Sequence, residues 1–157
     1  ELEEVRLSVY NDQQSLKLEL QSQKVENFKE EKLLKLQPIE VEVYSTESGK
    51  LLYTLNGDQG SYYSERQYLA IRGNVVIDSE QYQIQTAELD YYLQRNYLQG
   101  RGSVKINGEE FNLSAESFHS DLNLKDLKLS QNDETEQAVI NFSQTGNDLK
   151  IEESNDE

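Results

Sequence analysis

The sequence predicts an all-β protein built from stacked antiparallel hairpins, and three observations support that prediction. Apolar and polar residues alternate in most segments, as they do in strands with one buried face. Turn-forming residues separate these segments. A unit of strand, turn, strand and turn occurs twice between residues 62 and 116. A fixed repeat of this length indicates supersecondary units that share one core by stacking.

The repeat has a period of 29 residues. The offset falls to 28 between Ala87 and Ala115, so the second copy has lost one residue. A fainter copy precedes both, because Tyr53 and Leu55 lie 29 residues before Tyr82 and Ile84. Pairs with the full offset are Tyr68 and Tyr97, Gly73 and Gly102, Val75 and Val104, Ile77 and Ile106, Tyr82 and Phe111, and Ile84 and Leu113.

Before the repeats, alternation predicts strands over residues 5–9, 16–20, 39–43 and 51–55. Residues 24–37 also fit a short amphipathic helix, but the flanking period of two favours extended structure. Pro38 prevents a helix at that point and favours an extended conformation for the residue before it. Turns are expected at residues 11–14, at Ser48-Gly49 and at Asn56-Gly57.

Within the repeats, strands over residues 68–77 and 97–106 are followed by returning strands over 82–86 and 111–115. Asn107-Gly108 is a strong hairpin signal, because both residue types tolerate positive φ. Alternating leucines from Leu122 to Leu129 predict one long strand with a bulge near Asp126.

Residues 131–137 then predict a polar loop, and 138–142 a terminal strand. We expect residues 1–145 to form one β domain and the acidic residues 146–157 to be a disordered tail.

Composition excludes several functions. The chain of 157 residues has a net charge of −15, which opposes binding to nucleic acid or to an anionic membrane through a basic patch. Without cysteine it has no disulfide or thiolate metal site. Only 35% of the residues are hydrophobic, which favours a thin sandwich over a thick core. No segment has the roughly 20 apolar residues of a membrane span.

No residue pattern indicates a catalytic, metal or cofactor site. His119 is the only histidine and has no local partners of the kind a triad or a metal site needs. Glu88 and Asp90 could form a two-carboxylate hydrolase site, but carboxylates are so abundant that such pairs arise by chance. We therefore expect no enzyme, with a carbohydrate hydrolase as a remote alternative.

One apolar face is the candidate site. The face could be an ordinary filled core, or it could line a partly open groove that accepts hydrocarbon chains, and composition leaves both open. The recurring tyrosines likewise fit either cross-strand pairing or the mouth of such a groove. The eleven candidate groove residues are Leu69, Ile71, Val75, Ile77, Tyr82, Ile84, Leu98, Val104, Ile106, Phe111 and Leu113.

Residues 20–130 resemble the lipopolysaccharide-export component LptC and its OstA-like relatives. The most specific part is Leu69-x-Ile71-x-Gly73-Asn74-Val75, followed by Tyr82-x-Ile84-x-Thr86-x-x-Leu89-x-Tyr91. Gly60-x-Tyr62 and Gly102-Ser103-Val104 also fit the family pattern. Residues 1–24 and the acidic tail extend beyond the part that matches.

The resemblance implies a partly open β-jellyroll of V-shaped strands with an apolar interior. It implies a periplasmic protein, anchored to the inner membrane by an N-terminal helix that this chain lacks. Its partners would be lipopolysaccharide, the inner-membrane ABC transporter and a periplasmic bridge protein joined by edge-strand pairing. The alternatives are the soluble bridge protein of the same system, or a structural or adhesive β-repeat protein without a lipid ligand.

Overall fold

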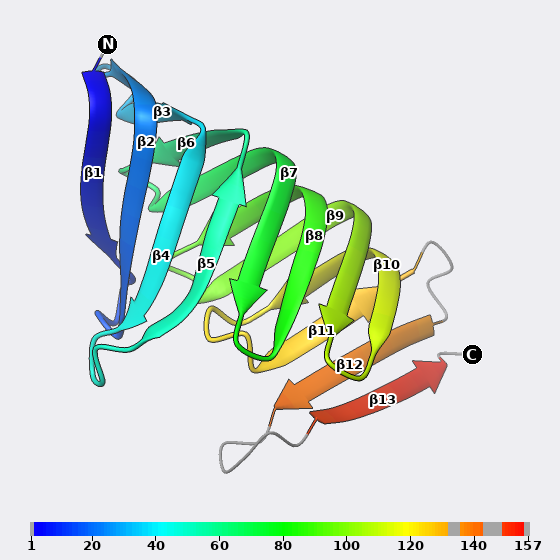
Figure 1. The fold of residues 1–157 in the computed structure, drawn as a ribbon. Helices are drawn as coiled ribbons and strands as arrows, with labels where there is room; N and C mark the ends of the chain where they lie inside the picture. The colour runs from blue at the N-terminus through cyan, green and yellow to red at the C-terminus, as the bar shows by residue number, and fades with distance from the viewer. Residues whose placement is uncertain (1, 132–135, 143–148, 156–157) are drawn as a thin grey trace.

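The computed structural model describes residues 2–131, 136–142 and 149–155, and in these ranges thirteen strands form one antiparallel sheet (Figure 1). This confirms the predicted all-β jellyroll. The strands are β1 (Leu2–Tyr10), β2 (Leu16–Phe28), β3 (Leu33–Gln37), β4 (Ile39–Ser45), β5 (Leu51–Gly57), β6 (Gln59–Tyr63), β7 (Tyr68–Ser79), β8 (Tyr82–Tyr92), β9 (Tyr97–Gly108), β10 (Asn112–Ser120), β11 (Asp126–Ser130), β12 (Glu136–Phe142) and β13 (Leu149–Asn155).

The sheet is folded into a V because each long strand bends in the middle. β2 pairs with β4 through its first half and with β3 through its second half, and β7 pairs in the same way with β6 and then β5. Only Pro38 separates β3 from β4, and only Asp58 separates β5 from β6. We name the two halves arm A, residues 16–21, 39–45, 51–57, 75–79, 82–86, 104–108 and 112–115, and arm B, residues 24–28, 33–37, 59–63, 68–72, 88–92, 97–101 and 117–120.

Bulges form the vertex of the V in the two repeats. In β7, Gly73 and Asn74 have φ of +86° and +48°, and the register with β8 shifts there. In β9, Gly102 and Ser103 repeat the arrangement with φ of +93° and +49°. Two residues opposite one bend a strand, and glycine adopts positive φ without steric cost. The paired glycines of the sequence repeat therefore mark the bend of each strand.

Two predicted elements differ in the structure. Asn107 and Gly108 continue β9, and the hairpin turn lies one step later, where the Gly108 N–H donates to the Phe111 carbonyl at 2.9 Å. The reason is that Asn107 pairs with both Gln83 and Asn112, so the ladder extends past the expected turn.

The predicted long strand over residues 122–129 is only half right, because Asp126–Ser130 form β11 but residues 121–125 form a turn. Leu124 has φ of +58° there, and the Asp121 carboxylate accepts hydrogen bonds from the backbone N–H of Lys125 at 3.0 Å and of Asp126 at 3.3 Å. The alternating Leu122 and Leu124 are both buried from this turn, so their spacing mimics a strand.

Other expectations are met or lie partly outside the described residues. Residues 24–37 are extended in β2 and β3, and β12 covers the predicted terminal strand. β13 lies within the segment expected to be a disordered tail, where it pairs with β12. Residues 132–135 of the predicted polar loop, and 146–148 and 156–157 of the tail, lie outside the described ranges.

Candidate functional site

The candidate site is the apolar interior between the two arms. All eleven predicted residues face it. Nine of them have side chains that are at most 4% exposed, while Phe111 and Leu113 are partly buried at the C-terminal end of arm A. The alternation in the sequence therefore placed these residues on the correct face. Whether that face contacts lipid stays a prediction.

The interior of arm A contains one unbroken row of aliphatic side chains. Register pairs connect a single inward residue from each of eight strands that are neighbours in the sheet. The row starts on β1, which pairs with β2 beside this arm, and crosses the arm to β10. At a strand spacing of about 4.8 Å, seven steps give a length of about 34 Å. Its members are Leu7, Leu20, Val41, Leu55, Ile77, Ile84, Ile106 and Leu113.

Arm B carries a matching row that faces the first, running from β2 to β11. Two of its positions are glycines, and a Cβ atom at Gly100 would overlap the ring of Phe118, while one at Gly60 would overlap Ile39. Neighbouring side chains therefore fill the space that the glycines leave. The row is Val25, Leu36, Gly60, Ile71, Leu89, Gly100, Phe118 and Leu129.

None of the row members outside the repeats was part of the predicted site. They include Leu20, Val41 and Leu55 in arm A and Leu36 and Phe118 in arm B. The signal was present, because these residues alternate with polar neighbours in the same way as those in the repeats. Only the register between strands shows that they align with the repeat residues.

Charge is kept out of the interior. Among the described residues, the buried polar or charged ones are Asn11, Ser22, Thr86, Asp90 and Ser120. Asp90, the only carboxylate among them, is held on the outer face, where Tyr68 donates to it and Arg72 lies 2.8 Å away. Burial alone would raise the pKa of Asp90, but the hydrogen bonds from Tyr68 and Arg72 outweigh it and lower the pKa.

Glu88 and Asp90, the pair considered for a hydrolase, belong to this outer-face network. Arg72 contacts Glu88 at 3.3 Å as well as Asp90, and Arg101 lies 3.5 Å from Glu88. Within the described ranges, no group of three or more His, Asp or Glu residues is arranged to hold a metal ion.

The tyrosines divide between the two faces. On the outer face of arm B, a ladder of Tyr63, Tyr68, Tyr92, Tyr97 and His119 has successive ring centroids 5.5, 4.9, 6.0 and 5.7 Å apart. This is the cross-strand pairing expected of aromatic residues in sheets. Buried tyrosines are found on the inner face instead, namely Tyr53, Tyr62, Tyr82 and Tyr91.

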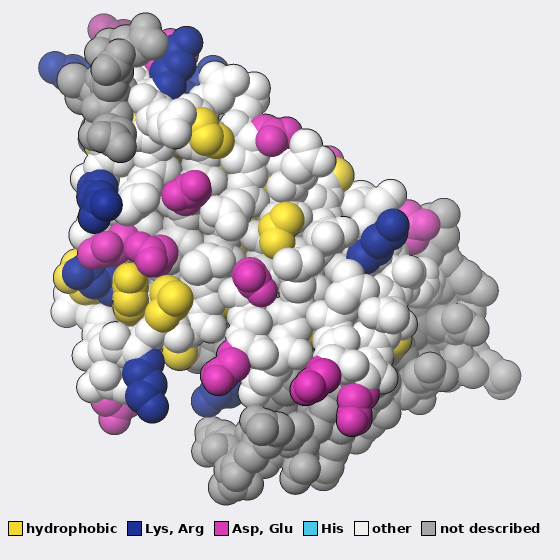
Figure 2. Space-filling view, in the orientation of Figure 1, with side chains coloured by type: hydrophobic (Ala, Val, Ile, Leu, Met, Phe, Trp, Pro, Cys, Tyr) yellow, Lys and Arg dark blue, Asp and Glu magenta, His cyan; other side chains and the backbone are white. Residues whose placement is uncertain are grey.

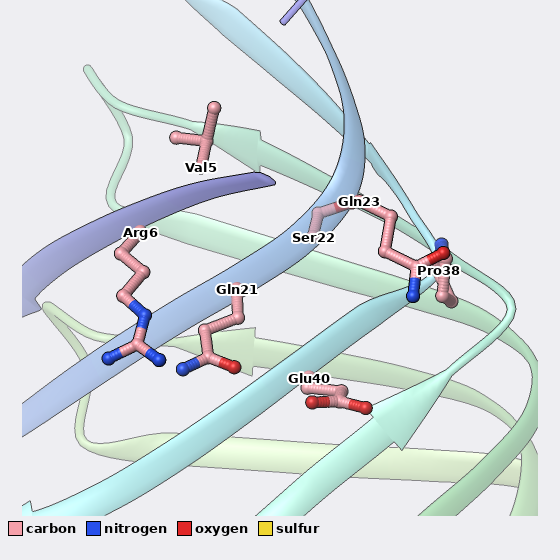
Figure 3. A pocket seen from close by; sticks show the side chains of 7 residues that line it. All are labelled: Val5, Arg6, Gln21, Ser22, Gln23, Pro38 and Glu40. Atoms are coloured by element: carbon pink, nitrogen blue, oxygen red, sulfur yellow. The ribbon is translucent and has the colours of Figure 1, made fainter. Parts of the chain in front are cut away.

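The one face of the outer surface drawn in Figure 2 is chemically mixed. Hydrophobic side chains are scattered on it among acidic and basic ones. A surface pocket near the N-terminal edge is lined by Arg6, Gln21, Gln23 and Glu40 together with Val5, Ser22 and Pro38 (Figure 3). A lining this polar is unsuited to hydrocarbon chains.

The fold defines a jellyroll of stacked hairpins around a packed apolar interior, and the described residues show no evident catalytic constellation. The model of the family described as "Lipopolysaccharide-assembly, LptC-related" matches residues 2–137, so the chain belongs to the LptC family. No curated protein matched the chain.

Membership connects the protein to lipopolysaccharide transport and assembly in the periplasm. The family is one of transport components and is not a known enzyme family. Over the described ranges, no helix is long and apolar enough to cross a bilayer.

Proposed function

We propose that the protein is a periplasmic transfer component that receives lipopolysaccharide from an inner-membrane ABC transporter and passes it to a bridge protein. The observation that carries the proposal is the pair of facing apolar rows. They extend from β1 to β10 in arm A and from β2 to β11 in arm B, and they contain no charged side chain. Such a trough suits acyl chains held side by side.

The energetics favour buried acyl chains and a head group that stays in solvent. Burying acyl chains in the trough stabilises the complex by about 0.8 kcal/mol per CH₂ before opposing costs. The net charge of −15 repels phosphorylated sugars, so the head group remains in solvent. The protein then acts as a passive conduit, and the transporter supplies the driving force.

Sheet edges at both ends of the stack suit the two partners. At the N-terminal end, β1 pairs with β2 and presents its other edge. At the C-terminal end, β11 pairs only with residues 117–119 of β10, so in the described part of the chain residues 112–115 form an edge of arm A. Free backbone groups along such an edge pair with a strand from another protein. We assign these edges to the transporter and the bridge protein, with an N-terminal helix as the membrane anchor.

A photocrosslinking pair tests the lipid site. Replacing Phe111 by p-benzoylphenylalanine keeps an aromatic ring of similar shape on the inner face, at the partly buried end of arm A. The matched control is the same replacement at Asn112, which is exposed and points to the opposite side of the strand. In cells that export lipopolysaccharide, we expect crosslinks to lipopolysaccharide from position 111 and few from position 112.

Two outcomes would contradict the proposal. One is equal crosslinking from the two positions, which would mean that the inner face has no preference for lipid. The other is no crosslink from position 111 when the variant is folded and crosslinks instead to protein partners. That result would favour a structural β-repeat protein with a permanently filled core.

A further inference from the structure

The free ends of the two arms contact each other across the opening of the V, through turns that leave arm B. Turns at residues 93–96 and 121–125 both leave arm B, and each buries a leucine, Leu93 and Leu122, with exposures of 1% and 0%. These leucines are 29 residues apart, so they occupy one place in the repeat. The backbone carbonyl of each leucine accepts a hydrogen bond, from the β1–β2 turn beside arm A in the case of Leu93 and from arm A itself in the case of Leu122.

The hydrogen bonds that connect these two turns to the other side of the V differ in length. At Leu93, the carbonyl accepts a long hydrogen bond of 3.4 Å from the Asp12 N–H in the β1–β2 turn. At Leu122, the carbonyl accepts from the buried Tyr53 hydroxyl at 2.5 Å, and Tyr53 is in turn bonded to the Tyr91 hydroxyl at 2.6 Å. At Leu122, one hydrogen-bonded chain therefore connects arm A, arm B and the turn.

A third tyrosine also bonds to the turn at residues 121–125. The Tyr82 hydroxyl in arm A donates to the Leu124 carbonyl at 3.2 Å. Burial raises the pKa of Tyr53, of Tyr82 and of Tyr91, so all three hydroxyls keep the protons with which they donate. Because the surroundings are apolar, these hydrogen bonds are stronger than they would be in water.

The turn is also held by hydrogen bonds of its own. The Asp121 carboxylate accepts from the backbone N–H groups of Lys125 and Asp126, and the Leu124 N–H donates to the Asp121 carbonyl at 3.1 Å. Residues 121–125 are therefore a preformed loop that can leave arm A as a unit. Its departure would break the hydroxyl bonds and withdraw two leucines from the interior.

Geometry restricts where a lipid can enter. The head group must stay in water while its acyl chains lie in the trough, so entry from the side requires a slit along the stack. On the vertex side, opening a slit would break the continuous ladder of the sheet. On the opposite side, the arms are held together by side-chain packing in the apolar interior and by the turn contacts with their leucines.

We propose that residues 121–125 are a lateral gate for acyl chains, latched shut by the hydroxyl groups of Tyr53, Tyr82 and Tyr91. This inference rests on the proposed lipid-transfer function and adds the route of entry. In the closed state Leu122 and Leu124 cover the interior. In the open state the turn swings away from arm A, and acyl chains take the place of the two leucines.

Spin-label distances test the gate, because the chain contains no cysteine of its own. Labels at Glu80→Cys and Asn123→Cys, both exposed positions, report the separation of the arm A hairpin from the turn. Labels at Glu80→Cys and Glu109→Cys are the control, because both lie in arm A hairpins whose strands pair directly. We expect purified lipopolysaccharide to lengthen the first distance and leave the second unchanged.

The latch is tested without lipid. The double variant Tyr53→Phe, Tyr82→Phe removes both hydroxyls that donate to the turn and keeps the rings. We expect the population with the longer 80–123 distance to rise about fivefold for each hydroxyl removed, as a hydrogen bond of about 1 kcal/mol implies. Tyr92→Phe, on the outer face beside Tyr91, should leave the distribution unchanged. The single variant Tyr82→Phe repeats the test if the double variant does not fold.

The outcomes separate the gate from the proposed function. If lipopolysaccharide crosslinks at position 111 but the 80–123 distance stays constant, the gate is wrong and the function stands. If the tyrosine variants leave the distance distribution unchanged, the latch is wrong whatever the lipid does. If lipopolysaccharide neither crosslinks at position 111 nor alters the distance, both the function and the gate fail.

Discussion

Ile84 and Leu113 occupy the same place in successive repeats, yet they have different surroundings. Ile84 lies in the middle of the stack between Ile77 and Ile106, and its side chain is fully buried. Leu113 pairs with Ile106 on one side only, because β11 does not extend along this part of β10, and it is partly buried. The repeat therefore determines which face a residue occupies, and its position in the stack determines how deeply it is buried.

The C-terminal end of arm A is thus less enclosed than the middle of the stack. Next to Leu113, the Ser114 carbonyl on the β10 edge accepts a hydrogen bond from the Gln131 side chain at 2.7 Å instead of from a strand. Phe111, the repeat partner of Tyr82, is partly buried at the same end. A partner strand that paired with residues 112–115 would extend the trough and bury both residues.

The largest effect should come from truncating the enclosed member of the pair. Ile84→Ala leaves a cavity between two packed strands, so we expect it to lower the free energy of unfolding by about 3 kcal/mol. Leu113→Ala should cost about 1 kcal/mol, because solvent already reaches that side chain. Urea denaturation followed by circular dichroism measures both. Equal losses would show that the end of the stack is as enclosed as its middle.

A smaller loss of stability is expected when Gly100 is given a side chain, as its repeat partner has. Gly100 is the repeat partner of Ile71, and the ring of Phe118 occupies the space where its side chain would be. Gly100→Ala should therefore overpack the interior and cost about 2 kcal/mol. Arg101→Ala, at the exposed neighbouring position, should change stability by no more than about 0.5 kcal/mol. A Gly100→Ala protein as stable as the wild type would mean that Phe118 can move aside freely.

The smallest expected effects are changes of stability with pH. They come from Asp90 and from His119, which occupies the same place in the next repeat. The pKa of Asp90 is lowered by Tyr68 and Arg72 against the effect of burial, so its contribution is lost as pH falls below about 4. Burial and the nearby Lys128 lower the pKa of His119, so its contribution is lost as pH falls below about 6.5. Both groups stabilise the fold above these values.

Melting temperatures between pH 8 and 2 separate the two contributions. The wild type should lose stability in two steps, and His119→Asn should remove the upper one, since the chain has no other histidine. Asp90→Asn should weaken the lower step, which other carboxylates share. If the His119→Asn curve is parallel to that of the wild type between pH 7.5 and 5, the histidine does not cause the upper loss of stability.

Much of the site was predictable because strand alternation is a local property. A side chain in a strand points opposite to its neighbours, so the pattern around Ile71 or Val104 is enough to place the residue inside. The tyrosines show the limit of this reasoning. Alternation places the adjacent Tyr91 and Tyr92 on opposite faces, but only the register shows that one joins the buried latch and the other the outer ladder.

The error at Leu122 and Leu124 has a similar cause. Two leucines separated by one residue satisfy the strand pattern, but here a turn with positive φ at Leu124 directs both inward. The offset of 29 residues from Leu93 to Leu122 was the available signal, since it relates this segment to another turn and not to a strand.

By itself, the sequence determined the all-β class, the repeat and the inner face, because each depends on residues close together in the chain. The tertiary structure alone decided the alignment of the apolar rows, the closure of the V by tyrosine hydroxyls and the open end of arm A. These depend on which strands lie side by side, and such contacts between distant segments are set by the register and packing of the whole sheet.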